Sequence, residues 1–498
     1  MMCRMLPRVV AAVAVTTLVI GLYLFEAAKD GVHTVERFVG STPITVYSAE
    51  DPDGPLAIIA HGFSGSRAMM QGLAFTLAQA GYHVAALDFP GHGDHLGRLS
   101  SNFTLLDAAT RQLENTISAV IDAELARAGR QAPVALIGHS MSTDVIVRLA
   151  ARDPRVGPLV AISMYSDAIT ATSPRQMLAV SGEFEVGLRN AALEAARLVD
   201  MRASEDEIVE SADGRVRRGA LVAPGVEHVG VLYSSITHDA TVDWLDAAYG
   251  RPGFDGRTPI SLGWPILLTL AGCLALFWPV SRLLRPSATL ATRGSTPWAA
   301  VLVPPIITPV MIWPLTGTLI PMPGMNYLTA HLAVYGLLAL ALLWRAGIRP
   351  ALDGWRTPLL LIVYAIGAIA VLIDWTFSDF LPSAERLLPL VGIALGAIPF
   401  MIADSLLLKT RDVPWWLRFA TRFLYFGSLI AGLSLVPETR LIIGFFFPVL
   451  ILFFLVFGLM ARWLEARQPA PTMTGAAQGV LLAYALASTV PLIESAVG

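Results

Sequence analysis

The stretch Leu136-Ile137-Gly138-His139-Ser140-Met141-Ser142 continues the apolar run Val134–Ile137 and decides the fold. A strand that ends in Gly-x-Ser-x-small and opens a helix forces the serine backbone into a sharp turn. That turn lifts the Ser140 hydroxyl clear of the sheet, where a histidine can reach it. The usual second glycine is replaced here by Ser142, another small residue. The pattern predicts a strand–turn–helix unit that presents a nucleophile.

Around this stretch, short apolar runs alternate with helix-like segments, which is the rhythm of a parallel sheet in an α/β fold. The predicted strands are Leu56–Ala60, His83–Leu87, Val134–Ile137, Leu159–Ser163, Gln176–Val180 and Gly219–Ala223, with a leading hairpin in Val35–Tyr47. The predicted helices are Ala68–Ala80, Leu105–Arg127, Met141–Ala151, Gly187–Val199 and Thr241–Tyr249. Chemistry in such sheets gathers beyond the carboxyl ends of the strands.

Two further motifs follow predicted strands: His61-Gly62-Phe63-Ser64-Gly65, and Asp88-Phe89-Pro90-Gly91-His92-Gly93-Asp94. With Gly138-His139-Ser140-Met141-Ser142, they resemble the α/β-hydrolase superfamily in order and spacing, over about residues 35–250. Within it, the chain looks most like the esterase, lipase and monoacylglycerol-hydrolase branch. The resemblance implies a serine hydrolase with an α/β-hydrolase fold, without cofactor or metal.

The superfamily's chain order is serine, acid, histidine. His228 follows the last predicted strand and is the expected base, with His238 as a rival that we interpret as a helix cap or surface residue. Glu185, in Gly182-Glu183-Phe184-Glu185, matches the position of the acid, although aspartate is usual there. Glu183 and Asp167 remain alternatives for this role.

The resemblance implies an oxyanion hole made by the backbone N–H groups of Phe63 and Met141. We interpret His61 as a residue that holds its loop in shape. His92 and His95 could suggest a metal site together with Asp88 and Asp94, but we interpret these histidines as solvated loop residues.

Composition indicates that part of the chain is embedded in a membrane. The 498 residues are 55% hydrophobic, with a mean hydropathy of +0.61. The net charge of −3 argues against a nucleic-acid partner. Runs of about 20 apolar residues, enough to cross a bilayer as helix, recur near Val9–Phe25 and from Leu262 onward. The later ones lie near 262–284, 298–320, 327–345, 358–376, 387–408, 415–435, 441–463 and 474–494.

Arginines are concentrated in every second loop between the predicted spans, as expected if the N-terminus is cytoplasmic. The predicted organisation is a membrane anchor at 1–29, an extracytoplasmic hydrolase domain at 30–258 and a domain of about eight helices at 259–498. A bacterial inner membrane and a periplasmic hydrolase domain are expected. The arrangement is similar to that of the glycosylphosphatidylinositol inositol-deacylase family, in architecture only.

The gap Met164–Arg175 is too short for the helical cap that many lipases insert, so we expect the membrane domain to cover the site, with Ile320–Met325 as the favoured segment. The expected function is hydrolysis of acyl esters, with a lipid or lipid-linked substrate favoured. The alternatives are a peptidase or thioesterase with the same triad, and a transporter or assembly factor with a degenerate hydrolase domain. The sequence leaves the oligomeric state open.

Overall fold

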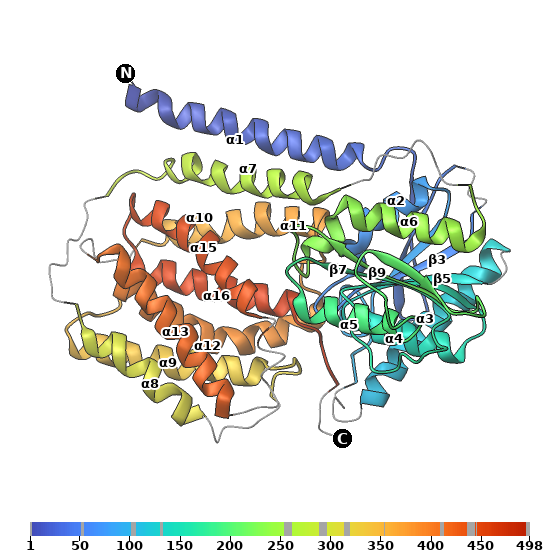
Figure 1. Ribbon diagram of the computed structural model, residues 1–498. Helices are drawn as coiled ribbons and strands as arrows, with labels where there is room; N and C mark the ends of the chain where they lie inside the picture. Colours follow the sequence, from blue (N-terminus) through green and yellow to red (C-terminus); the bar gives the residue numbers. More distant parts are fainter. Residues whose placement is uncertain are drawn as a thin grey trace. The chain divides into compact units, whose positions relative to one another are not determined.

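A computed structural model describes residues 2–50, 54–100, 106–129, 133–252, 261–287, 296–312, 319–352, 354–408, 413–435, 444 and 446–494 (Figure 1). The chain divides into two compact units. The sheet unit comprises Val19–Thr269 and, from much later in the chain, Trp375–Asp379. The helical unit comprises Met1–Leu18, Leu270–Asp374 and Phe380–Gly498.

The sheet unit is built on a mixed, mostly parallel sheet. Its strands within the described residues are β1 (His33–Val39), β2 (Thr42–Ser48), β3 (Leu56–Ala60), β4 (His83–Leu87), β5 (Val134–His139), β6 (Val156–Ile162), β7 (Gln176–Gly182), β8 (Glu207–Glu210) and β9 (Arg217–Ala223). The strand order is β1-β2-β4-β3-β5-β6-β7-β9-β8. From β4 to β9 the neighbouring strands are parallel, whereas β1, β2 and β8 pair antiparallel at the two edges.

Helices cover the sheet, so its central strands are buried on both faces. The helices are η1 (Arg67–Met70), α2 (Gln71–Gln79), α3 (Leu106–Ala128), α4 (Met141–Arg152), α5 (Val186–Arg197), η2 (Gly230–Tyr233) and α6 (Ser235–Tyr249). Every residue of β3 and of β5 is buried, which explains why these strands are apolar runs without alternation. Residues 163–175, between β6 and β7, contain no helix or strand. The predicted fold class, with no large cap, is confirmed.

One strand of this unit was not predicted, and two predictions about its last helix are wrong. Strand β8 was not predicted, because Glu207-Ile208-Val209-Glu210 is a short and mostly polar edge strand. Helix α6 begins at Ser235 rather than Thr241. As a result His238 lies inside the helix, fully buried, where its ring hydrogen bonds Thr76 Oγ1 at 2.9 Å and the Leu232 carbonyl at 2.8 Å. It is therefore a core residue and neither a cap nor a surface group.

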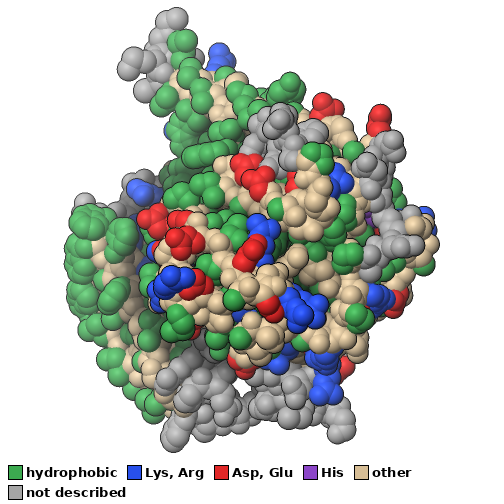
Figure 2. All heavy atoms as spheres, turned by 45° about the vertical axis from the view of Figure 1, so that its right-hand side comes forward, with side chains coloured by type: hydrophobic (Ala, Val, Ile, Leu, Met, Phe, Trp, Pro, Cys, Tyr) green, Lys and Arg blue, Asp and Glu red, His purple; other side chains and the backbone are tan. Residues whose placement is uncertain are grey.

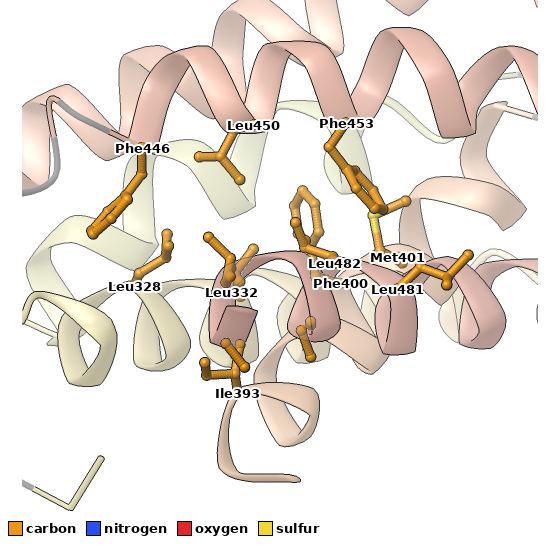
Figure 3. Close-up of a cluster of buried hydrophobic side chains, with 14 of the residues drawn as sticks. Leu328, Leu332, Ile393, Phe400, Met401, Phe446, Leu450, Phe453, Leu481 and Leu482 are labelled. Atoms are coloured by element: carbon orange, nitrogen blue, oxygen red, sulfur yellow. The ribbon is translucent and has the colours of Figure 1, made fainter. Parts of the chain in front are cut away.

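The helical unit packs long apolar helices around a core of leucine, phenylalanine and methionine side chains (Figure 3). The helices of this region are α7 (Gly263–Ser281), α8 (Trp298–Ile312), α9 (Met325–Arg345), α10 (Arg356–Tyr364), the π-helical η3 (Ala365–Ala370), α11 (Val371–Thr376), α12 (Ala384–Leu408), α13 (Trp415–Leu435), α15 (Phe446–Glu465) and α16 (Pro471–Thr489). Helix α1 (Met2–Ala27) contributes its first part to this unit. Small residues let α12 approach its neighbours closely: a Cβ atom on Gly336 of α9 or on Gly479 of α16 would clash with the α12 backbone.

Among the described residues, six helices are long and apolar enough to cross a membrane. They are Met5–Ala27, Gly263–Ser281, Met325–Arg345, Arg356–Thr376, Ala384–Leu408 and Phe446–Glu465, and α8 is a shorter apolar helix. By composition, the chain is a membrane protein. Helices α13 and α16 lie where spans were predicted without being among these six, so the count of about nine spans stays a prediction.

Asp404 of α12, an acidic residue in an apolar helix, has a charged partner. Arg422 of α13 donates to both carboxylate oxygens of Asp404 on α12, with 2.7 Å between Arg422 Nη2 and Asp404 Oδ2. The guanidinium also lies 4.1 Å from the centre of the Phe454 ring. A bidentate pair of this kind offsets the cost of placing either charge among apolar helices. A structural role, the neutralisation of two charges among apolar helices, is therefore enough to explain this pair.

Candidate active site

Ser140 stands at the turn between β5 and α4 in a strained backbone conformation. Its φ is 54° and its ψ is −117°, a region that L-residues other than glycine rarely occupy. The Ser140 N–H donates to the Ile162 carbonyl at 2.9 Å, which ties the turn to the end of β6. The predicted strand–turn–helix unit is present, and its geometry presents the Ser140 hydroxyl at the carboxyl end of the sheet.

A row of hydrogen bonds links the three residues that the sequence singled out. His228 Nε2 lies 2.9 Å from Ser140 Oγ, and His228 Nδ1 lies 2.5 Å from Glu185 Oε1. The carboxylate accepts only, so the neutral imidazole carries its proton on Nδ1 and leaves Nε2 to accept from the serine hydroxyl. This is the arrangement that makes a serine hydroxyl nucleophilic.

Glu185 is held in place by its other oxygen. Glu185 Oε2 accepts from the Gly182 N–H at 2.7 Å and from the Ser163 hydroxyl at 2.7 Å. Burial would raise the pKa of Glu185, but the hydrogen bonds from His228, Gly182 and Ser163 outweigh it and hold the pKa below its ordinary value. The carboxyl group is therefore ionised at neutral pH and aimed at the imidazole.

The alternative acids lie elsewhere. The Asp167 side chain is 71% exposed and pairs with Arg148. Glu183 Oε2 accepts from the Gly225 N–H at 2.7 Å and so stabilises the turn after β9. Neither of these carboxylates has a hydrogen bond to His228 within the described residues, whereas Glu185 does. The geometry favours Glu185, whose role remains part of the proposal below.

Ser142, the departure from the usual motif, has a structural explanation. Its hydroxyl accepts from the His139 N–H at 2.8 Å and donates to the Ala60 carbonyl at 2.8 Å. Ala60 is the last residue of β3, and the His61–Gly65 loop begins immediately after it. A glycine at position 142 would leave both backbone groups without this partner. Ser142 thus joins the nucleophile turn to the strand that carries the neighbouring loop.

His139 anchors the backbone of the candidate base. Its Nε2 atom lies 2.9 Å from the His228 carbonyl, to which it donates. Burial and the neighbouring His228 lower the pKa of His139 to about 3, so this ring is neutral at neutral pH. This role of His139 was not predicted, because its only signal in the sequence is the position of His139 beside the nucleophile.

The predicted oxyanion loop lies against the nucleophile turn. A Cβ atom on Gly62 would lie 2.9 Å from His139 Nδ1 and 3.0 Å from Ser140 Cβ, closer than such atoms normally approach, so glycine lets the loop pass close to the nucleophile. His61 Nδ1 donates to the Gly62 carbonyl at 2.7 Å, and its Nε2 accepts from the Phe89 N–H at 3.1 Å. His61 therefore braces the loop, as expected. Phe63 and Met141 follow Gly62 and Ser140, where an oxyanion hole needs its two N–H donors.

Arg67, for which no role was predicted, pairs with three carboxylates, two of them in the Asp88–Asp94 loop. The carboxylates of Asp88, Asp94 and Asp379 have oxygen atoms within 4.8 Å of one another, and the Arg67 guanidinium pairs with all three. Burial would lower the pKa of Arg67, but the carboxylates raise it above its ordinary value. Arg67 thus supplies the positive charge that the cluster needs.

The expectation that both loop histidines are solvated is wrong for His92. It is buried against the rings of His61 and Phe63. Its Nδ1 lies 3.0 Å from the Pro90 carbonyl. It therefore belongs to the packing beneath the oxyanion loop.

Apolar side chains are exposed on the segments that follow β6 and β7, two strands at this end of the sheet. Tyr165, Phe184 and Val186 are 68%, 66% and 63% exposed. The Tyr165 N–H donates to Thr143 Oγ1, which itself donates to the Ser140 carbonyl, and the Phe184 N–H donates to the Val226 carbonyl. The space-filling view shows apolar side chains interspersed with charges of both signs on one face (Figure 2). We call Tyr165, Phe184 and Val186 the apolar rim.

Buried histidines make the stability of the sheet unit depend on pH. Burial lowers the pKa of His238 to about 4 from 6.5. Below pH 6.5 the unfolded chain binds a proton that the folded chain does not, so stability falls as the pH falls from 6.5 to about 4. His238 contributes up to about 1.4 kcal/mol per pH unit to this slope. We expect His238→Gln to flatten the dependence of the unfolding temperature on pH, with the exposed His33→Gln as control; equal slopes would contradict this assignment.

The fold and the motifs together define an α/β-hydrolase domain, and the same chain also contains long apolar helices. Residues 52–217 match the family described as Serine aminopeptidase, S33. The matched residues include Ser140 and Glu185 and end before His228. The comparison with curated proteins gave no match.

Several solved structures are similar to the same region. A protein from Thermus thermophilus is 18% identical, with 44% of this chain and 99% of that chain covered and a TM-score of 0.35. A predicted CIB-like hydrolase from Thermoplasma acidophilum is 18% identical, covering 44% and 100%, with a TM-score of 0.34. A presumed lipase from Acinetobacter baumannii is 14% identical, covering 46% and 97%, with a TM-score of 0.33.

Proposed function

We propose that the chain is a membrane-bound serine ester hydrolase that cleaves acyl esters through an acyl-enzyme intermediate. The observation that carries the proposal is the hydrogen-bonded row Ser140–His228–Glu185 at the carboxyl end of the sheet. A hydrolase activity follows from the domain that the chain contains. That Ser140 is the nucleophile and that the substrate is an ester are the parts that we propose.

In the first half of the reaction, Ser140 Oγ attacks the ester carbonyl while His228 Nε2 takes the hydroxyl proton. Glu185 keeps the imidazole in the required tautomer and stabilises the imidazolium that forms. The carbonyl oxygen becomes an oxyanion, which the N–H groups of Phe63 and Met141 stabilise. When the tetrahedral intermediate collapses, the bond to the alcohol breaks and His228 donates its proton to the leaving oxygen.

In the second half, water replaces the alcohol. His228 Nε2 takes a proton from the water as its oxygen attacks the acyl carbon on Ser140. A second tetrahedral oxyanion forms in the same hole. Its collapse breaks the bond to Ser140 Oγ, which recovers its proton from His228, and the carboxylic acid leaves.

A lipid or lipid-linked substrate is favoured by two observations. The apolar rim offers surface for an acyl chain beside the candidate nucleophile, and each CH₂ that is removed from water contributes about 0.8 kcal/mol. The same chain carries helices that are apolar enough to lie in a bilayer, which is where such substrates are found.

The proposed arrangement keeps residues 30–258 outside the cytoplasm, between an anchor at 1–29 and a membrane domain at 259–498. The predicted topology places residues 377–386 on the same side as the hydrolase domain. The grouping of Trp375–Asp379 with Val19–Thr269 in one unit supports that part of the topology. A bacterial inner membrane with a periplasmic hydrolase domain is proposed on the same reasoning.

A peptidase is the second candidate, because the matching family is described as a serine aminopeptidase. An aminopeptidase needs a negative group for the free ammonium of its substrate. Besides Glu185, the carboxylates of Glu183 and Glu227 lie near the base, and both accept N–H groups of the turn around it. The ester remains the favoured substrate because apolar side chains are exposed beside the candidate nucleophile.

A substrate panel tests the choice. Full-length protein in detergent is assayed with a four-carbon ester, a long-chain ester and an aminoacyl anilide. We expect kcat/KM to be at least about 10-fold higher for the long-chain ester than for the short one, because further CH₂ groups are buried. We also expect little cleavage of the anilide. Faster cleavage of the anilide than of either ester would assign the protein to the peptidases.

A further inference from the structure

A five-residue segment from the membrane-embedded part of the sequence is built into the sheet unit. Trp375–Asp379 comprises the last two residues of α11 and the three residues that follow it, yet it packs with Val19–Thr269. The Asp374 carboxylate accepts from the N–H groups of Phe380 and Leu381, both at 2.8 Å, and so joins the two ends of the segment. The segment is therefore a closed loop, which we call the inserted loop.

The inserted loop contacts the residues that follow the predicted oxyanion loop. Ser378 Oγ lies 3.1 Å from Ser66 Oγ, and the Asp379 N–H donates to Ser66 Oγ at 3.3 Å. One residue later, Arg67 Nη1 lies 3.8 Å from Asp379 Oδ2. Gln71 Nε2 donates to the Thr376 carbonyl at 3.1 Å. The contacts thus involve Ser66, the helix η1 that follows it and the first residue of α2.

These contacts hold one end of the segment Gly62–Ser66, whose other end lies against the nucleophile. Gly62 lies against Ser140, and the Gly65 N–H donates to the Gly62 carbonyl at 3.1 Å, which closes a turn around Phe63. Only two residues, Ser64 and Gly65, separate Phe63 from Ser66, whose hydroxyl binds the inserted loop. Ser66 and Thr376 are buried, so water does not compete freely for these hydrogen bonds.

A second contact reaches the side of the site that carries the base. Phe377 stacks on Tyr233, with 6.3 Å between ring centres and 26° between ring planes. Tyr233 is the last residue of η2, and the Val231 N–H near its start donates to the Glu227 carbonyl at 3.0 Å, immediately before His228. The inserted loop therefore bridges the segments that follow the oxyanion loop and the base.

We propose that Trp375–Asp379 is a positioning element of the active site, which holds the Gly62–Ser66 loop so that the Phe63 N–H points at the developing oxyanion. The inference rests on the proposed function. Removal of an oxyanion donor costs a factor of about 100 to 1,000 in kcat, because preorganised donors need no rearrangement during the reaction. A loop that holds such a donor should matter less than the donor itself. The membrane region would then contribute to catalysis and not only to anchoring.

The test uses full-length Ser378→Ala/Asp379→Asn in detergent with a short-chain ester. We expect kcat/KM to fall about 10-fold, through kcat with little change in KM. A trifluoromethyl ketone places its own oxyanion in the hole, so its inhibition constant should rise by the same factor. Asp122→Asn is the matched control, because Asp122 also pairs with an arginine, Arg155, at the opposite end of the strands. This control should match the wild type.

A reversible variant keeps the test decisive if the first one folds poorly. The two hydroxyl oxygens are close enough that Ser66→Cys/Ser378→Cys could be joined by a disulfide. The oxidised form should keep activity, and reduction should lower it about 10-fold in the same sample. Unchanged kcat/KM in both variants, or a fall in kcat/KM without weaker binding of the ketone, would overturn the inference. The proposed function fails separately, if wild-type protein does not react at Ser140.

Discussion

Replacement of Ser140 by alanine is expected to lower ester hydrolysis by a factor on the order of 10⁶, with the fold intact. The reason is the loss of the only atom that can form the acyl-enzyme, since His228 and Glu185 act through the Ser140 hydroxyl. The oxyanion donors and substrate binding should leave a residual rate above that in water. The measurement is kcat for an ester in detergent, together with covalent labelling by a fluorophosphonate.

The control is Ser118→Ala, which removes a hydroxyl that bonds Arg155 away from the site. It should label and hydrolyse as the wild type does. Undiminished hydrolysis by Ser140→Ala would exclude the proposed nucleophile. Absence of labelling in the folded wild type would instead favour a transporter or assembly factor with a degenerate hydrolase domain.

Glu185→Gln is expected to reduce kcat by a factor on the order of 10⁴ without unfolding the protein. Glutamine fills the same space, but it cannot stabilise the imidazolium and it can present an N–H to His228 Nδ1. The ring then adopts the tautomer that carries its proton on Nε2, which cannot accept from Ser140. The kcat of purified variants on one ester is the measurement.

Asp167→Asn is the comparison variant and should be nearly silent, because the Asp167 side chain is exposed and paired with Arg148. If Asp167→Asn carries the loss and Glu185→Gln does not, Asp167 is the acid in solution. The pairing of His228 with Glu185 would then describe a different state of the loop.

The sequence was informative where burial or backbone strain restricts the residues that fit. Strands β3 and β4 were predicted with the bounds that the structure has, because both are apolar runs closed by polar motifs. Ser140 was found because its positive φ needs small neighbours. His228 and Glu185 were found because the superfamily's chain order fixes where to look, and the structure brings both to Ser140.

The features that were missed depend on contacts distant in sequence or on weak local patterns. The hydrogen bond between Ser66 and Ser378 joins residues that no periodicity relates, so the inserted loop could not be predicted. Ser163 and His139 act through single hydrogen bonds to Glu185 and His228, which leave no pattern in the sequence. The cover that we expected from Ile320–Met325 stays a prediction.

The most direct test of the central claim is to trap the acyl group. Full-length protein is mixed with an activated long-chain p-nitrophenyl ester, so that acylation outpaces deacylation, and is quenched in acid before peptide mass spectrometry. The proposed mechanism predicts that the peptide containing Ser140 gains the mass of the acyl group, and that Ser140→Ala gains none. Hydrolysis at the wild-type rate with the acyl group on another residue, or on none, would contradict it.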